Sequence, residues 1–324
     1  MVGLFDPSRD SVARLNHIFP EASRHDGFAQ LFETGAELAI VASPPRYHAE
    51  QTIRLLQAGL SVLCEKPMAT CVAEAEAMVE AATTARGVLA VGLLRRFFPA
   101  TQTIRDILSK GMIGEVMGFY FFEGDDFRWP VASPDYFRKG AGRGGVLLDI
   151  GVHALDLLLW WWGHPNEIVY EDDAMGGVEA NCRIQIRFSQ GFRGEIRLSR
   201  DWPSRSHYII EGNNGWLRWE VNEADRVELG FANSRYTLKA QLFENGDTRS
   251  VSPHPAANFH LSFIDQLRNV VAAIRGDEQL RVSGENGLQS IKLIEHCYRH
   301  RKLMSMPWLG ETQEQRATEL SMAD

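Results

Sequence analysis

The sequence predicts an α/β protein built from two domains of different architecture. In roughly the first hundred residues, short apolar segments alternate with amphipathic segments of helical period, which is typical of a parallel sheet with right-handed helical connections. Further along, segments of strict two-residue alternation follow one another, which is typical of an antiparallel sheet with one solvated face. The length of 324 residues also favours two domains. We therefore predict an α/β domain over 1–97 and an α+β domain with an open, mostly antiparallel sheet over 98–324.

Glycine, proline and capping residues bound the predicted elements of the first domain. The chain begins with the end of a strand, and Asp6 or Ser8 caps the helix that follows. The apolar run before Glu65 lies between Gly59 and Pro67 and is short enough to be a buried strand. The predicted strands cover 1–5, 38–42, 60–64 and 88–91, and the helices cover 7–19, 48–58 and 71–86.

The second domain is predicted to combine an antiparallel sheet with helices. Clean alternation marks strands over 183–188 and 193–200, and the strands 208–210 and 216–219 flank a Gly-Asn-Asn-Gly turn. Another hairpin turns at Asn245-Gly246. We expect the polar tail after Trp308 to be loose. The predicted helices cover 100–110, 146–162, 259–275 and 284–301.

Composition excludes several classes of protein. A formal net charge of −8 argues against a nucleic-acid binder, which would present a basic surface. Residues 1–20 do not read as a signal peptide, and the most apolar segment carries Asp149, His153 and Asp156, so it is a poor membrane span. The four cysteines form no C-x-x-C pair and suggest no disulfide framework. We expect a soluble, cytoplasmic protein that binds neither nucleic acid nor membranes.

The motif Glu65-Lys66-Pro67 is the most informative short feature of the chain. It follows directly on the predicted strand over 60–64, and α/β enzymes bind their ligands beyond the carboxyl ends of the strands. Taken alone, the three residues are also compatible with a surface salt bridge before a helix, because charged residues are common at strand ends.

A second group of polar residues lies in the long apolar helix predicted over 146–162. Asp149, His153 and Asp156 are spaced i, i+4 and i+7 and so share one stripe of that helix. Burying a carboxylate and an imidazole is costly unless they are paired or face a wet pocket. An aspartate held against a histidine fixes its tautomer and makes it an oriented general base. The alternative is an internal polar cluster that only joins the two domains.

Five blocks of sequence together resemble the Gfo/Idh/MocA (glucose–fructose oxidoreductase / inositol dehydrogenase) family, in matching order and spacing. The resemblance covers nearly the whole chain, and its specificity comes from the combination, since each block alone is weak. The blocks are Ala42-Ser43-Pro44-Pro45 with His48 and Gly59, Glu65-Lys66-Pro67-Met68-Ala69, Val91-Gly92-Leu93-Leu94-Arg95-Arg96-Phe97, Gly111-Met112-Ile113-Gly114-Glu115-Val116, and Gly144-Gly145 followed by Asp149, His153 and Asp156.

The resemblance implies an N-terminal Rossmann domain and hydride transfer between nicotinamide and a hydroxyl-bearing carbon of a sugar or polyol. It implies that Lys66 lies between nicotinamide and substrate, where its cation favours a partly anionic reacting oxygen. It implies that His153 takes the hydroxyl proton and that Asp149 orients the site or binds a neighbouring hydroxyl. It also implies homo-oligomers built through the C-terminal sheet.

The remaining site residues are likewise carried over from the family. Ser43, Pro44 and His48 match positions that line the cofactor, and Glu65 matches the loop beside it. Arg95 and Arg96 match the segment between the domains, where one side chain can reach substrate or cofactor. The resemblance further suggests a cis Lys66-Pro67 bond.

One departure from the family is large, because this sequence contains no G-x-G-x-x-G turn to hold a pyrophosphate. The chain starts at what matches the second strand of a Rossmann domain, so the expected domain is N-terminally truncated. Asp6 aligns with the acid that binds the adenosine ribose and favours NAD, although Ser8 and Arg9 could instead receive the 2′-phosphate of NADP. The missing strand would be central, so we expect two unpaired strand edges. Three explanations stay open: a late start codon, a fragment, or a protein that has lost dinucleotide binding.

Other candidate sites are weaker. His296 and His300 have metal-compatible spacing, but a third ligand is not near in sequence, and a solvated helix face is the simpler interpretation. The tryptophans at 160–162 are more often core than sugar-stacking residues at such a helix end. We expect substrate recognition in the loop before the long helix, which contains Arg128, Trp129, Tyr136 and Arg143.

Two functions from different classes follow. The first is an NAD(P)-dependent oxidoreductase of a sugar, inositol or related polyol, favoured by the intact set of Lys66, Asp149 and His153. The second is a non-catalytic family member that binds a sugar ligand or a protein partner, favoured by the missing glycine turn. Hydrolysis of a glycosidic bond, which distant NAD-using relatives perform, is a weaker third.

Overall fold

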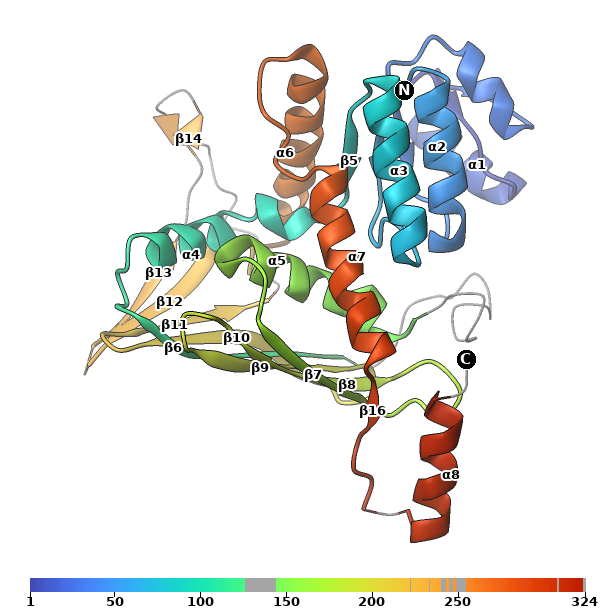
Figure 1. Cartoon of the computed structure of the whole chain (residues 1–324). Coiled ribbons are helices and arrows are strands. Elements are labelled where there is room, and N and C mark those ends of the chain that lie inside the picture. Colours follow the sequence, from blue (N-terminus) through green and yellow to red (C-terminus); the bar gives the residue numbers. More distant parts are fainter. Residues whose placement is uncertain are drawn as a thin grey trace.

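The computed structural model describes residues 1–125, 144–221, 223–232, 234–239, 243–244, 247–248, 255–307 and 309–322. Figure 1 shows a helical body around a small parallel sheet, which contains the N-terminus, and a broad sheet that carries helices on one face. None of the described helices is long and apolar enough to cross a membrane.

The N-terminal body contains the predicted parallel sheet. Strands β3 (Leu38–Val41), β4 (Ser61–Cys64) and β5 (Leu89–Val91) pair in that order, all parallel. The connections carry α2 (His48–Gln57) and α3 (Val72–Ala85), which pack side by side. Every residue of β4 is buried, as expected for the middle strand of a sheet covered on both faces.

The first strand lies apart from this sheet, which confirms the prediction of two unpaired edges. Strand β1 (Gly3–Leu4) pairs in parallel with β2 (Ser23–Arg24) as a separate two-stranded sheet. Within the described residues, neither strand pairs with β3, whose Ile40 is 49% exposed. The predicted helix, α1 (Arg9–Ile18), is capped by Ser8 and buries none of its residues. A short 3-10 helix over Phe28–Glu33 then leads to β3.

The second domain is built on a nine-stranded sheet in the order β13-β12-β11-β10-β6-β9-β8-β7-β16. Neighbouring strands are antiparallel except β6 with β9 and β7 with β16, so the prediction of an open, mostly antiparallel sheet is confirmed. The strands are β6 (Val116–Gly124), β7 (Glu167–Asp172), β8 (Asn181–Arg187), β9 (Arg193–Ser199), β10 (Ser204–Gly212), β11 (Trp216–Glu220), β12 (Arg226–Phe231), β13 (Ser234–Lys239) and β16 (Lys302–Leu303).

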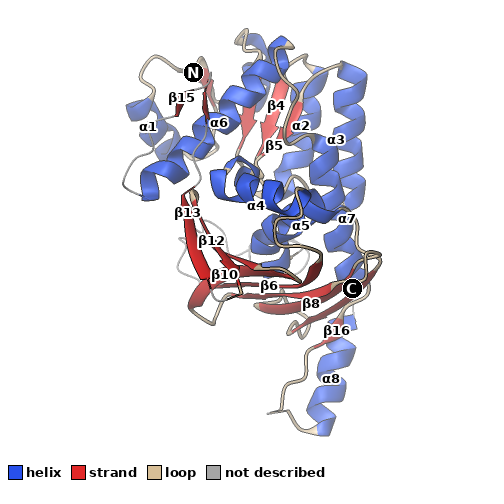
Figure 2. Cartoon of the chain, turned by 90° about the vertical axis from the view of Figure 1, so that its left-hand side faces the viewer, coloured by secondary structure: helices blue, strands red, loops and turns tan. Residues whose placement is uncertain are grey.

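Helices cover one face of this sheet, and the described chain leaves the other face open (Figures 1 and 2). Helices α4 (Pro99–Ser109) and α5 (Val152–Trp162) lie on the covered face. Helix α6 (Pro255–Arg275) packs against the 3-10 segment Leu94–Phe97. Helix α7 (Gly284–Arg299) contacts both α3 and α5, so it packs against both bodies, and one apolar core runs through them. The change from parallel to antiparallel pairing falls between β5 and β6, and the boundary at 97/98 stays a prediction.

Three predicted elements differ in detail from the structure. The helix predicted over 146–162 begins with a π-helical turn, Leu147–Gly151, before α5. The tail after Trp308 was predicted to be loose, but Glu311–Met322 forms helix α8, which buries Ala317 and contacts β16. The hairpin near Asn245 is formed by β14 (Phe243–Glu244) and β15 (Asp247–Thr248), and its two turn residues lie outside the described part of the chain.

Candidate active site

Lys66 and Asp149, which are 83 residues apart in sequence, meet at the carboxyl end of β4. The Lys66 ammonium donates to the Asp149 carboxylate at 2.9 Å (Nζ to Oδ1) and to the Asp149 backbone carbonyl at 2.8 Å. The two side chains are 25% and 26% exposed, so the ion pair is accessible to a ligand. The Lys66-Pro67 bond is cis, as the family resemblance suggested.

The π-helical turn places Asp149 between two cations. The second oxygen of its carboxylate accepts from the Arg200 guanidinium, whose side chain is 8% exposed. Arg200 directly follows β9, a strand that packs against the turn. The sequence reasoning missed Arg200, because an arginine that ends an alternating strand resembles the exposed arginines along the same strand.

His153 lies in the first turn of α5 as a half-buried neutral base. Burial, reinforced by the positive charges of Arg95 and Lys66, holds the pKa of His153 well below its ordinary value. Its buried Nδ1 has no hydrogen-bond partner among the residues that the structure describes. The Asp149 carboxylate accepts from Lys66 and Arg200, and the predicted support of His153 by Asp149 stays a prediction. A neutral imidazole is able to accept a proton, and the role of His153 as the general base stays a prediction.

Two consecutive arginines join the segment after β5 to the second domain. Arg95 forms two hydrogen bonds of 2.6 and 2.7 Å to the Glu123 carboxylate, and it also donates to the Tyr208 hydroxyl at 3.1 Å. Arg96 makes a buried pair with Asp156, with bonds of 2.9 and 2.6 Å. Burial raises the pKa of Asp156, and the Arg96 charge opposes that rise. Asp156 thus belongs to an internal ion pair, and a contact of Arg95 with cofactor or substrate stays a prediction.

The residues predicted to line a cofactor cluster at the strand ends. His48 is 1% exposed, and its Nδ1 and Nε2 lie 2.8 Å from the Pro67 carbonyl and 2.7 Å from the Ser43 carbonyl. Burial lowers the pKa of His48, although the two carbonyls oppose that change. His48 therefore braces the turns after β3 and β4, and we propose that it shapes the cofactor site without touching the cofactor.

The other predicted cofactor residues make local contacts. The Ser43 hydroxyl donates to the Gln51 side chain at 2.6 Å, just before Pro44. The Glu65 carboxylate accepts from the Lys66 amide at 3.3 Å, and burial raises the pKa of Glu65. Beyond β1, the Asp6 carboxylate accepts from the Ser8 amide at 2.7 Å and is half-buried.

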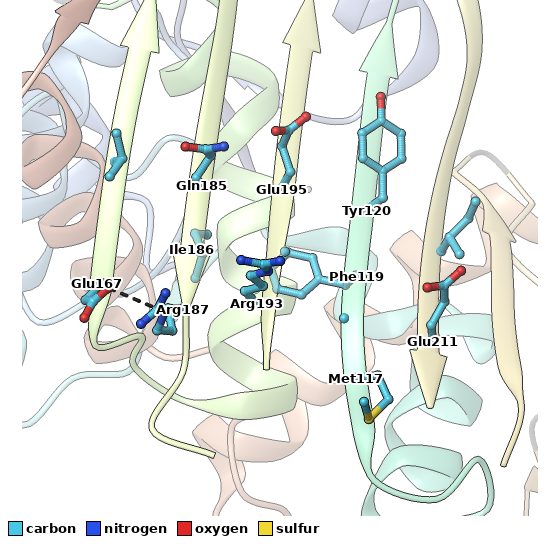
Figure 3. Close-up of a pocket in the computed structure, with 14 residues that line it drawn as sticks. Met117, Phe119, Tyr120, Glu167, Gln185, Ile186, Arg187, Arg193, Glu195 and Glu211 are labelled. Carbon is cyan, nitrogen blue, oxygen red and sulfur yellow. Dashed lines mark ion pairs between the residues drawn. The ribbon is translucent and has the colours of Figure 1, made fainter. Parts of the chain in front are cut away.

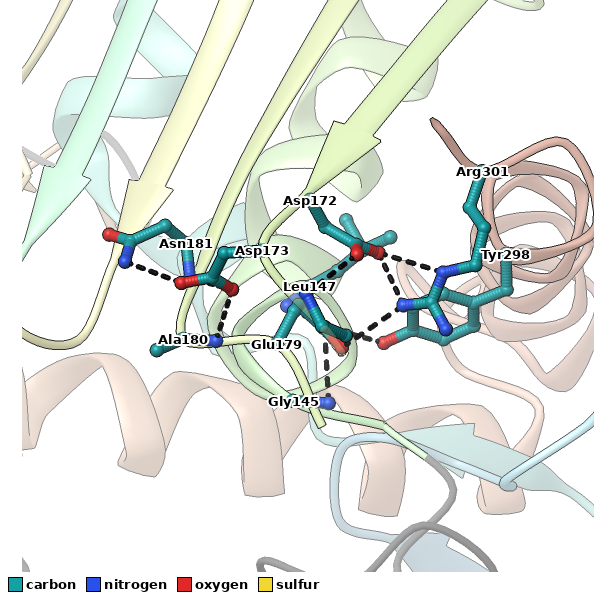
Figure 4. A network of polar contacts seen from close by, with 10 residues as sticks. Gly145, Leu147, Asp172, Asp173, Glu179, Ala180, Asn181, Tyr298 and Arg301 are labelled. Atoms are coloured by element: carbon teal, nitrogen blue, oxygen red, sulfur yellow. Dashed lines mark hydrogen bonds and ion pairs between the residues drawn. The ribbon is translucent and has the colours of Figure 1, made fainter. Parts of the chain in front are cut away.

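A buried acid that the sequence reasoning missed fixes the start of the π-helical turn. The Glu179 carboxylate accepts from the amides of Gly145 and Leu147 at 3.1 and 3.0 Å and from the Tyr298 hydroxyl at 2.8 Å, as Figure 4 shows. A Cβ on Gly145 would lie 2.0 Å from the Glu179 carbonyl oxygen, so this position requires glycine. An acid at a helix N-terminus satisfies amides that have no partner within the helix. Through this turn, Glu179 controls where Asp149 lies.

Two of the weaker candidates can be placed in the structure. His296 and His300 stack with ring centroids 4.3 Å apart, and the described residues contain no group of three possible metal ligands. Trp161 and Trp162 pack against Phe121, which confirms a core role. The predicted recognition residues Arg128, Trp129, Tyr136 and Arg143 lie outside the described residues.

Comparison with known proteins gives the family. Residues 1–93 match the oxidoreductase family with an NAD-binding Rossmann fold, and residues 101–218 match the GFO/IDH/MocA C-terminal domain. Over 304 residues the chain is 34% identical to the D-glucoside 3-dehydrogenase of Escherichia coli K12, covering 84% of this chain and 79% of that protein. The chain belongs to the Gfo/Idh/MocA family. It is thus an oxidoreductase with NAD as its cofactor, as the sequence motifs predicted.

Other Gfo/Idh/MocA members show the same relationship. The levoglucosan dehydrogenase of Pseudarthrobacter phenanthrenivorans is 25% identical over 269 residues, covering 71% of this chain and 69% of the enzyme. An inositol dehydrogenase homologue from Azotobacter vinelandii, solved with NADH and myo-inositol, superposes with a TM-score of 0.80 at 20% identity, covering 93% of this chain and 87% of that structure. At that identity the superposition supports the fold alone.

The residues of this chain fit the two ends of NAD. At the nicotinamide end, the partly exposed Lys66 ammonium offers a hydrogen-bond donor, and the half-buried His153, whose pKa it helps to lower, offers a neutral imidazole. At the other end, the half-buried Asp6 follows β1, where a carboxylate can bind ribose hydroxyls. The sequence contains no glycine turn for the pyrophosphate between them.

Proposed function

We propose that this oxidoreductase transfers a hydride between NAD and a hydroxyl-bearing carbon of a sugar, inositol or related polyol. The meeting of Lys66 and Asp149 beside the neutral His153 carries the proposal. The named dehydrogenases among its relatives act on a D-glucoside, on levoglucosan and on myo-inositol, which supports this substrate class.

The proposed mechanism assigns each group a separate task. Bound NAD supplies the hydride acceptor. Lys66 donates a hydrogen bond to the reacting hydroxyl oxygen and favours its developing negative charge. His153 accepts the hydroxyl proton, which its lowered pKa allows because the imidazole is neutral near pH 7. Asp149 holds Lys66 in place before substrate binds.

The proposed cofactor contacts follow from the strand ends. Asp6 binds the adenosine ribose hydroxyls, which favours NAD over NADP. Ser43 and Pro44 line the path from the ribose toward Lys66, with Glu65 beside it and His48 fixing the loops behind it. Each contact is a proposal from the placement of these residues at the carboxyl ends of the strands.

An NADH titration followed by a turnover assay tests this function. Two proteins are compared: this chain, and a chimera in which the first strand and glycine turn of the D-glucoside 3-dehydrogenase precede Met1. We expect the chimera to bind NADH with a submillimolar dissociation constant and to reduce NAD with at least one of a methyl glucoside, levoglucosan and myo-inositol. If neither protein binds NADH at millimolar concentration, the proposal fails. Sugar binding without turnover in the chimera would favour the non-catalytic alternative.

We further propose that a second copy of the chain covers the open sheet face. A hollow of about 730 Å³ lies there, over strands β6 to β10 (Figure 3). Its lining combines exposed apolar side chains, such as Met117 and Val169, with charges of both signs, including the Glu167–Arg187 pair. A face that carries charges of both signs and exposed apolar area can be complementary to a second copy of itself across a two-fold axis.

Light scattering on a size-exclusion column tests this interface. We expect the unaltered protein to be a dimer or a larger assembly at micromolar concentration. Val169→Asp should dissociate it, because the new carboxylate would be buried against the partner. Met112→Asp, at an equally exposed apolar residue in the turn after α4, is the matched control and should change nothing. A monomeric unaltered protein would contradict the proposal.

A further inference from the structure

The Asp149 carboxylate is paired with two cations that differ in how exposed they are to solvent. Its Oδ1 accepts from Lys66 at 2.9 Å, and its Oδ2 accepts from Arg200. Lys66 is 25% exposed, whereas Arg200 is 8% exposed. Both cations therefore share the charge of this one carboxylate.

The backbone and packing around Arg200 hold this arginine in place. Its amide donates to the Ala180 carbonyl at 3.0 Å, which continues the pairing of β8 with β9. The end of β9 also presses on the π-helical turn: a Cβ on Gly151 would lie 2.7 Å from the Leu198 side chain. A guanidinium is planar and orients a carboxylate, whereas an ammonium on a flexible stem is easily redirected. Arg200 is therefore the stationary partner of Asp149, and Lys66 is the movable one.

We propose that Arg200 is a positioning residue: it remains the counter-ion of Asp149 and so frees Lys66 to hydrogen-bond the reacting hydroxyl. If Lys66 were the only cation on Asp149, turning it toward a substrate would leave a half-buried carboxylate without a counter-ion, which is unfavourable. With Arg200 in place, the carboxylate stays paired and oriented while Lys66 exchanges partners. The inference rests on the proposed function only for what Lys66 then does.

The first test measures the rate at which trace acetic anhydride acetylates the Lys66 amine. Mass spectrometry reads this rate, and the measurement requires neither NAD nor turnover. Arg200→Ala removes a cation from Asp149 and so strengthens the attraction between the carboxylate and the Lys66 ammonium, so we expect Lys66 acetylation to slow by about threefold to tenfold. Lys110, which is exposed on the turn after α4, is the internal control and should react unchanged. Unchanged or faster acetylation of Lys66 would overturn the proposal.

A second variant, Arg200→Lys, tests the proposal independently, and it remains available if Arg200→Ala does not fold. The proposed effect on Lys66 depends on the positive charge at position 200, which Arg200→Lys keeps, so Lys66 acetylation should stay within about twofold of the unaltered protein. A larger departure would contradict the proposal. In the double variant Asp149→Asn with Arg200→Ala, the acetylation rate should equal that of Asp149→Asn alone, because the proposed effect passes through the carboxylate.

Turnover supplies the link to catalysis. Once the chimera is shown to oxidise a polyol, Arg200→Ala should lower kcat by about tenfold to a hundredfold and change the dissociation constant of NADH by less than about threefold. A general loss of structure would weaken NADH binding as well. Failure of the polyol assay in the chimera would count against the proposed function but leave the acetylation result standing.

Discussion

Replacing Lys66 by alanine is expected to lower kcat by about a hundredfold to a thousandfold, with NADH binding changed by less than about threefold. Lys66 is the one side chain in the proposed mechanism that donates to the reacting oxygen, where charge develops during the reaction. Interactions that strengthen only in the transition state affect kcat and not binding. Single-turnover kinetics and an NADH titration on the same preparation separate the two effects.

The Lys66→Ala result is informative because the fold has a reason to survive it. Asp149 keeps Arg200 as a counter-ion, so the variant does not leave a buried carboxylate unpaired. Lys110→Ala, which removes an exposed ammonium far from the strand ends in sequence, is the matched control and should behave like the unaltered protein. Turnover at the normal rate in Lys66→Ala would refute the assigned role.

Substituting His153 should cost about a hundredfold to ten-thousandfold in kcat, the range typical of a lost general base. His153→Asn keeps a side chain of similar shape and is preferred over alanine, because the position packs within an apolar helix whose neighbours are buried. NADH binding should again be nearly unchanged. A variant that oxidises the polyol at more than about half the normal rate would show that another group takes the proton.

The pH dependence of polyol oxidation follows from the lowered pKa of His153. The base must be neutral, and its pKa lies well below 6.5 because of burial and the charges of Arg95 and Lys66. The rate should therefore stay on its plateau as the pH falls through 6.5 and decline only as it reaches the lowered pKa. Measuring kcat/KM against pH gives this value for the free enzyme. A decline centred near the ordinary histidine value would contradict the geometry.

Much of the fold could be predicted because its signals are local. Short apolar runs bounded by glycine or proline located β3 and β4, and two-residue alternation located β8 and β9. The separation of β1 from β3 could also be anticipated, because no strand in the described residues lies between them and each keeps one unpaired edge. The polar tail was misjudged: α8 depends on the contact of Ala317 with the rest of the fold, which local polarity does not show.

The candidate site could be predicted only in part from the same local signals. The spacing of Asp149 and His153 suggested a mutual pair, but the π-helical turn before α5 shifts the carboxylate toward Lys66 and Arg200. A periodicity argument assumes a regular helix and cannot register such a turn. Glu179 was missed because a single acid in an irregular segment has no pattern around it, although it holds the two amides at the start of the turn.

By itself, the sequence determined which residues carry charge and where the strands and helices form, because both depend on residue type and on neighbours along the chain. The tertiary structure alone decided how those charges are paired. Lys66 joined Asp149, Arg96 joined Asp156, and Arg95 joined Glu123. Each pair links segments distant in sequence, and burial makes pairing a condition of stability, so the partners are chosen by the packing of the domains. That packing also lowers the pKa of His153 through burial and the charges of Arg95 and Lys66, so its imidazole is neutral, as the proposed role as a proton acceptor requires.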